Sequence, residues 1–346
     1  MSHGDVAQTG RKTRWRRWRW ILSVAPIGVF LVAAEIGLRI DGRYRPEPRI
    51  YPGERTNKTS SNFIPDELVG WRMKPSHDFR MPWGRNEIRY RSNALGFRSV
   101  REFVKERTGK RRIAVVGDSH SFALGLEYDK SFGARLEQSM KDVEVLNFAL
   151  PGSGVDQMWL TARHYALPLK PDVLIVALYG SDFPRTQTAY RLSEGFNKPL
   201  YKLVGGRLVQ REAGDTPSTL EMFLERHSYL WAAVRLAVRW FGIRHPIGEF
   251  WTLNQAVLDQ LREDCREAKV PVVFVFIPFR SWKPFPALED YMRRTRAKFI
   301  DLSRTPPTKS KDIYFFLDGH LAAPGHYHVA ELLREHLRPI LPPPSK

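Results

Sequence analysis

Ile113-Ala-Val-Val-Gly-Asp-Ser-His120 is the stretch of sequence that decides the fold of this 346-residue chain. Its four apolar, mostly β-branched residues predict a buried strand, and Gly117-Asp-Ser119 then turns the chain before a run that is compatible with a helix. A serine on such a turn lies at the carboxyl edge of a parallel sheet, where a nucleophile is useful. The alternative is an ordinary strand–helix turn in which Asp118 or Ser119 only caps the helix. The rest of the chain must distinguish the two.

From residue 111 onward, β-branched runs alternate with amphipathic runs, which is typical of a parallel α/β sheet. We expect strands at 113–116, 143–150, 173–178, 270–277, 299–302 and 314–317, and helices at 132–140, 157–166, 252–268 and 325–337. The segment 184–250 interrupts this rhythm as an insertion or cap. Within it, Arg235 and Arg239 share one face of an amphipathic run, which fits a surface helix of the domain, a cap or a membrane-surface helix.

The N-terminal region combines a basic block with an apolar run. The formal net charge of the chain is +18, and residues 11–19 (RKTRWRRWR) contribute six cations. Residues 20–34 carry no charge, and with the next four residues they approach the ~20 that a helix needs to cross hydrocarbon. We therefore expect a basic cytoplasmic segment at 1–19 and one uncleaved transmembrane helix at 20–40, because no small-x-small cleavage site ends the run. The positive-inside rule then places the rest of the chain outside the cytoplasm, at the inner membrane of the cell.

The remaining chain is expected to form one large folded domain. Residues 41–84 read as a linker and irregular lead-in, with short β structure expected over 67–105, and the domain covers 85–340. Hydrophobic residues make up 42% of the sequence, which is enough for a core. The single cysteine, Cys265, excludes an internal disulfide and is expected to be a buried helix residue.

Polar residues gather where the expected strands end. Gly152 follows the second strand, and a glycine there lets a backbone N–H approach a ligand oxygen. Ser181 follows the third strand, while Asp318 and His320 follow a late apolar run and precede the last helix. Because parallel strands end at one edge of a sheet, these residues are expected to lie near Ser119.

In this order the motifs resemble those of the SGNH/GDSL hydrolase family. Gly117-Asp-Ser-His120, Asn147 to Gly152 and Asp318-Gly-His320 are similar to its first, second and last blocks. Asn93-Ala-Leu-Gly-Phe-Arg98 and Gly152-Ser-Gly-Val-Asp-Gln157 are similar to segments of membrane-anchored bacterial members. The resemblance covers roughly residues 85–340. It implies a three-layer α/β/α sandwich with a mostly parallel, flavodoxin-like sheet, here preceded by the transmembrane helix.

The resemblance also implies roles for five residues. Ser119 is the nucleophile, His320 the general base, and Asp318 the carboxylate that fixes the histidine tautomer. Ser119 and Gly152 would donate backbone N–H groups to the oxyanion. Ser181 occupies the position of the family's oxyanion-hole asparagine, so that a shorter hydroxyl replaces the amide; losing one such donor typically costs about 2.7–4 kcal/mol in the transition state.

Other chemistries fit the sequence less well. His320, His326 and His328 lack a metal-ligand spacing, so we expect no metal and no cofactor. We expect His120 to line the entrance of the site, and His326 and His328 to have surface or capping roles. An α/β-hydrolase elbow would need glycine at 121, where this chain has serine. The basic block adjoins the apolar run, which favours a role in membrane topology over nucleic-acid binding.

The resemblance predicts a membrane-anchored serine esterase or acylhydrolase that acts on ester substrates, namely O-acyl carbohydrates, outside the cytoplasm. One alternative is an O-acetyltransferase of an envelope polysaccharide, because a sugar hydroxyl in place of water would convert hydrolysis into transfer. A single-span transferase would need a multi-span partner to bring the acyl group across the bilayer. The other alternative is a non-catalytic carbohydrate-binding module that has kept the fold.

Overall fold

The computed structural model describes most of the chain, and the description below is confined to residues 25–42, 62–83, 86–107, 109–187, 190–191, 196–211, 220, 223–224, 227–240, 247–278, 285–305, 313 and 319–343. The chain divides into two compact units. One contains Met1–Arg49 and Thr216–Arg244, and the other contains Ile50–Asp215 and His245–Lys346.

The smaller unit contains a helix at residues 25–41 and helix α7 (Tyr229–Trp240). Glu35 caps α7: its carboxylate accepts the backbone N–H groups of Tyr229 and Leu230 at 3.0 and 2.9 Å. The first five residues of the expected 20–40 helix lie outside the described residues. Within the part of the chain that is described, no helix is long and apolar enough to span a membrane.

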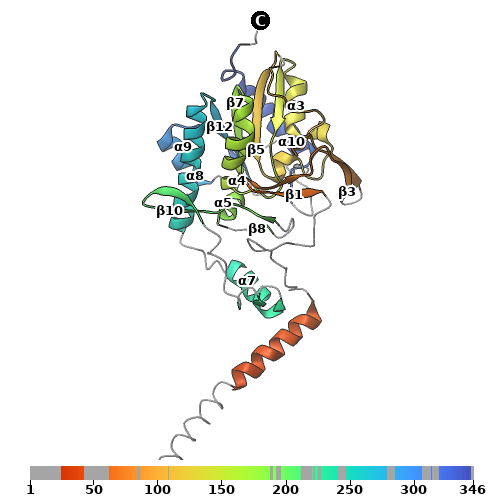
Figure 1. Ribbon diagram of the computed structural model, residues 1–346, viewed down its shortest axis with the longest axis vertical. Helices are drawn as coiled ribbons and strands as arrows, with labels where there is room; N and C mark the ends of the chain where they lie inside the picture. Colours follow the sequence, from red (N-terminus) through yellow and green to blue (C-terminus); the bar gives the residue numbers. More distant parts are fainter. Residues whose placement is uncertain are drawn as a thin grey trace, which may run out of the picture. The chain divides into compact units, whose positions relative to one another are not determined.

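The larger unit is built on a five-stranded sheet in the spatial order β6-β5-β7-β12-β13 (Figure 1). Every neighbouring pair is parallel. The strands are β5 (Arg111–Gly117), β6 (Val143–Asn147), β7 (Val173–Tyr179), β12 (Val272–Ile277) and β13 (Lys298–Asp301). This is the flavodoxin-like order 2-1-3-4-5, so the expectation of a parallel α/β/α sheet is confirmed.

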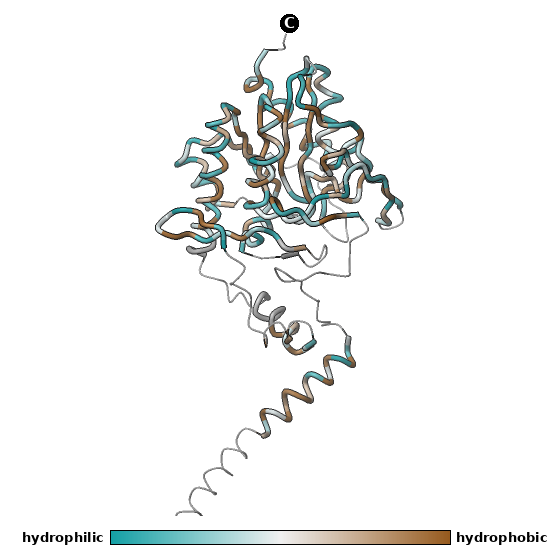
Figure 2. The backbone as a smooth tube through the Cα atoms, viewed as in Figure 1, coloured by the Kyte–Doolittle hydropathy of each residue, from teal (hydrophilic) through white to brown (hydrophobic). Residues whose placement is uncertain are grey.

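Successive side chains along each strand point to opposite faces of the sheet, so each packs against one of two helical layers. Val116, Val176 and Phe274 belong to the hydrophobic cluster that includes residues of the helices on one face, whereas Val115 and Ile175 belong to the cluster of the opposite face. The first face is covered by α4 (Val155–Thr161), α8 (Ile247–Glu267) and α9 (Pro286–Thr295), and the second by α3 (Phe132–Ser139) and α10 (Ala323–Leu337). The apolar strands accordingly lie between the helices in Figure 2.

Most expected elements are present, with differences at their ends. Helix α9 was not predicted, and the strand expected at 314–317 lies outside the described residues. Helix α4 ends earlier than expected because the chain continues as a π-helical turn, Ala162–Ala166, and a 3₁₀ turn, Leu167–Leu169. Cys265 is buried on α8, as expected. Further 3₁₀ turns occupy Tyr128–Lys130 and Leu302–Arg304.

Short antiparallel hairpins precede the sheet strands in the sequence, and others follow β7. The lead-in forms β1 (Phe63–Asp66) with β2 (Gly70–Met73), and β3 (Asp78–Trp83) with β4 (Asn86–Arg91). Strands β2, β3 and β4 confirm the short β structure expected over 67–105, whereas β1 lies in the stretch expected to be linker. These hairpins share a small core with Phe122, three residues after Ser119. Within the segment 184–250, the structure also has the pairs β8 (Tyr190–Arg191) with β9 (Phe196–Asn197) and β10 (Tyr201–Val204) with β11 (Arg207–Gln210).

Candidate active site

The turn after β5 positions the serine. Asp118 is extended at φ −96°, and its side chain accepts the backbone N–H of His120 at 2.9 Å, which starts the four-residue helix α2 (Ser119–Phe122). A Cβ on Gly117 would lie 2.4 Å from the Ser121 hydroxyl oxygen, so only glycine fits at this strand end. Asp118 therefore caps the helix, as one interpretation of the sequence predicted, and this leaves Ser119 available for another role.

Ser119 and His320 are brought together from positions 201 residues apart. The Nε2 atom of His320 lies 2.8 Å from the Oγ atom of Ser119. Ser119 is buried, and the histidine side chain is partly exposed. With a neutral imidazole whose Nε2 is unprotonated, the hydroxyl donates to the ring, which is the arrangement that a serine and its general base require. Asp318, the predicted third member, lies outside the described residues.

Two aromatic side chains surround the His320 ring. Trp83 of β3 meets it edge to face, with ring centroids 5.7 Å apart, and the His120 ring lies 5.1 Å away. His120 also packs 4.1 Å from the Tyr179 ring. It is only 3% exposed. The expectation that His120 lines the entrance is therefore wrong, because its ring is buried against Tyr179.

The glycine predicted for the oxyanion hole, Gly152, has a left-handed backbone conformation. Gly152 has φ +73°, a left-handed conformation that an L side chain rarely adopts. The next residue, Ser153, donates its hydroxyl to the Gly117 carbonyl at 2.9 Å, which connects this loop to the nucleophile turn. Ser181 directly precedes the one-turn helix α5 (Asp182–Arg185) and is partly exposed. Its role as an oxyanion donor stays a prediction.

The buried carboxyl groups of Asp118 and Asp182 both contact the guanidinium of Arg185 next to the nucleophile turn. Burial disfavours ionised Asp118, yet His120 and Arg185 outweigh this effect and hold its pKa below the ordinary value. Burial, and then the negative charge of Asp118, raise the pKa of Asp182 well above its ordinary value. The sequence indicated Asp182 only as a neighbour of Ser181, and it gave no sign of Arg185.

A buried arginine supports the end of α2. Arg98 is 1% exposed and donates to the carbonyl groups of Phe122 at 2.8 Å and Ala123 at 2.6 Å. Its guanidinium lies 4.3 Å from the centroid of the Tyr90 ring. Burial lowers the pKa of Arg98 to about 10, so the group stays charged at neutral pH. The sequence marked this residue through the motif 93–98, without assigning it a function.

His326 is buried and caps a helix, so of the two roles expected for it, surface or capping, the structure shows capping. Its Nδ1 atom accepts the backbone N–H of Phe132 at 3.1 Å, so the ring caps the start of α3. Burial lowers the pKa of His326 to about 3. His328 instead lies 2.7 Å from the Thr305 carbonyl oxygen, on the exposed side of α10. Among the described residues, no group of three or more His, Cys, Asp or Glu side chains could hold a metal ion.

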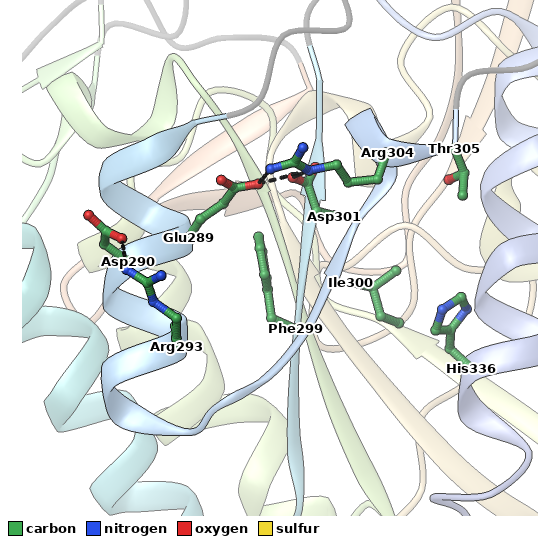
Figure 3. A pocket seen from close by; sticks show the side chains of 9 residues that line it. All are labelled: Glu289, Asp290, Arg293, Phe299, Ile300, Asp301, Arg304, Thr305 and His336. Carbon is green, nitrogen blue, oxygen red and sulfur yellow. Dashed lines mark hydrogen bonds and ion pairs between the residues drawn. The ribbon is translucent and has the colours of Figure 1, made fainter.

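A pocket of about 480 Å³ lies beside strand β13 (Figure 3), and the residues that line it include neither Ser119 nor His320. Its charged side chains pair with each other. Arg304 binds Glu289 at 2.5 Å, and Arg293 contacts Asp290 on the same helix.

Comparisons with known proteins give structural likeness only. No protein-family model matches the chain, and no curated relative does. The solved structure of TesA is similar over 66% of this chain and 99% of that one, at 16% identity and a TM-score of 0.42. A putative lipolytic protein of the G-D-S-L family from Desulfitobacterium hafniense (10% identity, 66% and 100% coverage, TM-score 0.42) is also similar. So is the psychrotrophic esterase EstA from Pseudoalteromonas sp., at 12% identity, 66% and 98% coverage and a TM-score of 0.40.

Proposed function

We propose that this chain is a serine esterase of the SGNH/GDSL type. One observation carries the proposal, namely the 2.8 Å contact between the Ser119 hydroxyl and the His320 Nε2 atom. The serine follows β5, at the point between β5 and β7 where the order of the sheet reverses, and ligands of open α/β sheets bind at such points. Gly152, a glycine with positive φ, lies in the loop between the neighbouring strand β6 and helix α4.

The proposed reaction is acyl transfer through a covalent intermediate. His320 takes the proton of the Ser119 hydroxyl while the oxygen attacks the ester carbonyl. The backbone N–H groups of Ser119 and Gly152 stabilise the negative charge that develops on the carbonyl oxygen. His320 then gives its proton to the departing alcohol. The same ring then deprotonates a water molecule, whose oxygen attacks the acyl carbon. The bond between that carbon and Ser119 Oγ breaks, the acid leaves, and the ring returns the proton to Oγ.

Two further parts of this site are proposed from the resemblance to SGNH/GDSL hydrolases. Asp318, two residues before His320, would accept a hydrogen bond from the Nδ1–H group of the ring and so keep Nε2 unprotonated and able to act as a base. Ser181 would supply a third donor to the oxyanion. Its hydroxyl is shorter than an asparagine amide, so we expect Ser181→Asn to retain or raise kcat and Ser181→Ala to lower it.

We also propose that the protein is anchored in the inner membrane and acts on O-acyl carbohydrate outside the cytoplasm. The support for the anchor is the basic block at 11–19 followed by the uncharged run 20–34. The support for the substrate class is the resemblance to membrane-anchored bacterial members of the family. The partners would then be the membrane and an acylated glycan.

The test is the release of acetate from an acetylated glycan by the full chain, with and without an acceptor sugar. If the wild-type chain releases acetate without an acceptor sugar, and Ser119→Ala does not, the result supports the esterase. Transfer that requires an acceptor identifies an O-acetyltransferase, which would work with a multi-span donor partner. Glycan binding that is unchanged in Ser119→Ala, without turnover of any ester, would show a non-catalytic binding module and overturn the proposal.

A further inference from the structure

One guanidinium nitrogen binds three loops that leave three different strands. The Nη1 atom of Arg185 lies 2.7 Å from Asp182 Oδ1, 3.3 Å from Asp118 Oδ2 and 3.2 Å from the carbonyl oxygen of Ser153. Asp118 follows β5, Ser153 follows β6 and Asp182 follows β7. Arg185 therefore joins the carboxyl ends of the three neighbouring strands around the nucleophile.

Each of these three partners is next in sequence to one of the predicted oxyanion donors. Asp118 precedes Ser119, Ser153 follows Gly152, and Asp182 follows Ser181. A displacement of any partner therefore moves the adjacent donor through a single peptide unit. Oxyanion donors act only within about 2.7–3.1 Å of the developing charge. The separation of the three loops therefore decides whether all the donors lie within hydrogen-bond distance of the oxyanion.

The partners of Arg185 are themselves held in place. Asp118 uses its other oxygen to accept the His120 N–H at 2.9 Å, and Asp182 uses its other oxygen to accept the Tyr179 N–H at 2.7 Å. Both carboxyl groups are at most 2% exposed. A cation between them offsets the cost of placing two acidic groups in one buried site.

The loop after β6 also leaves space for the backbone of Arg185. A Cβ on Gly154 would lie 3.0 Å from the carbonyl carbon of Arg185 and 3.1 Å from its Cβ. The glycine two residues after Gly152 thus allows the first turn of the 184–250 segment to pack closely on the oxyanion loop. This contact is independent of the charge interactions and brings the same two segments together.

We infer that Arg185 is a positioning residue that sets the oxyanion hole by fixing the three donor loops to one another. The inference rests on the proposed esterase function. Because its partners are two carboxyl groups and a carbonyl, Arg185 acts through the protein rather than by binding an acidic substrate. Its loss should lower the rate of the chemical step and leave substrate binding nearly unchanged.

The test compares the full chain with its Arg185→Met and Arg185→Lys variants. Arg107→Met is the matched control, because Arg107 also binds a carboxylate, Asp172 at 2.8 Å, and a carbonyl, Lys170 at 3.0 Å, but at the opposite edge of the sheet. The measurements are kcat and KM for p-nitrophenyl acetate, the rate of inactivation by a fluorophosphonate, and the thermal unfolding midpoint.

We expect Arg185→Met to lower kcat and the inactivation rate about 100-fold, the usual effect of a misplacement of about 1 Å, with KM within about threefold of wild type. Arg185→Lys keeps the charge on a shorter side chain, so its kcat and inactivation rate should lie between those of wild type and Arg185→Met. Arg107→Met should retain wild-type kinetics. If Arg185→Met fails to unfold cooperatively, Arg185→Lys decides the question. Wild-type kcat in a folded Arg185 variant, or a change confined to KM, overturns the inference. An inactive wild-type chain instead overturns the proposed function.

Discussion

The buried ring of His326 should make the stability of this protein sensitive to mild acid. Its pKa is about 3 in the folded chain against the ordinary 6.5, so the unfolded chain takes up a proton that the folded chain refuses. The stabilisation is fully present above pH 6.5 and is lost as the pH falls from 6.5 toward 3. Between pH 7 and pH 4.5, this single group should remove about 2–3 kcal/mol from the free energy of unfolding.

The variant His326→Asn tests this figure. Asparagine can accept the Phe132 N–H through its side-chain oxygen, yet it does not titrate. Urea unfolding followed by tryptophan fluorescence at several pH values gives the free energy of each protein. The advantage of wild type over the variant should shrink by about 2–3 kcal/mol between pH 7 and pH 4.5.

The control for His326→Asn is Val329→Ala, a buried and non-titrating position on the same helix. Its loss of stability should be the same at every pH. A wild-type advantage over His326→Asn that stays constant to within about 0.5 kcal/mol would refute the reasoning, because the ring would then titrate alike in both states.

Three further perturbations have direct readouts. Lys198 and Asp156 form a fully buried ion pair, so Lys198→Met should lower the free energy of unfolding in urea by about 3–5 kcal/mol. The double variant Lys198→Met/Asp156→Leu should recover most of this loss, and no recovery would contradict the prediction. Gly117→Ala places a Cβ 2.4 Å from a serine hydroxyl and should lower the unfolding free energy by about 1–3 kcal/mol, whereas unchanged stability would mean that the turn relaxes freely. Trp83→Ala removes the ring against His320 and should lower kcat for p-nitrophenyl acetate about tenfold; wild-type kcat would show that the ring does not orient the base.

The parts of the fold that depend on local pattern could be predicted from the sequence. β-branched runs marked the strands β5, β7 and β12, and Gly117 marked the turn, because each follows from properties of a few neighbouring residues. Helix α9 was missed although its buried residues Leu288, Tyr291 and Met292 have helical spacing. Its charged residues Glu289, Asp290, Arg293 and Arg294 concealed the pattern.

The nearness of Ser119 and His320 was predicted for a different reason. Both follow apolar runs that were expected to be strands ending at one edge of a parallel sheet, and the resemblance to SGNH/GDSL hydrolases implied their roles as nucleophile and base. The structure places the two side chains 2.8 Å apart, and the run at 314–317 lies outside the described residues. Trp83 and Arg185 could not be found in this way. Their positions depend on how a hairpin and a one-turn helix pack on that edge, and no spacing within either segment encodes such a contact. The burial of His120 against Tyr179 depends on packing in the same way.

The central claim is that Ser119 is a nucleophile activated by His320. The most direct measurement is labelling of the purified full chain with a fluorophosphonate probe, followed by mass spectrometry of its peptides. We predict a single adduct on the peptide that contains Ser119, no adduct in Ser119→Ala, and labelling slowed about 100-fold or more in His320→Asn. An unlabelled wild-type chain, or an adduct that persists in Ser119→Ala, would contradict the claim.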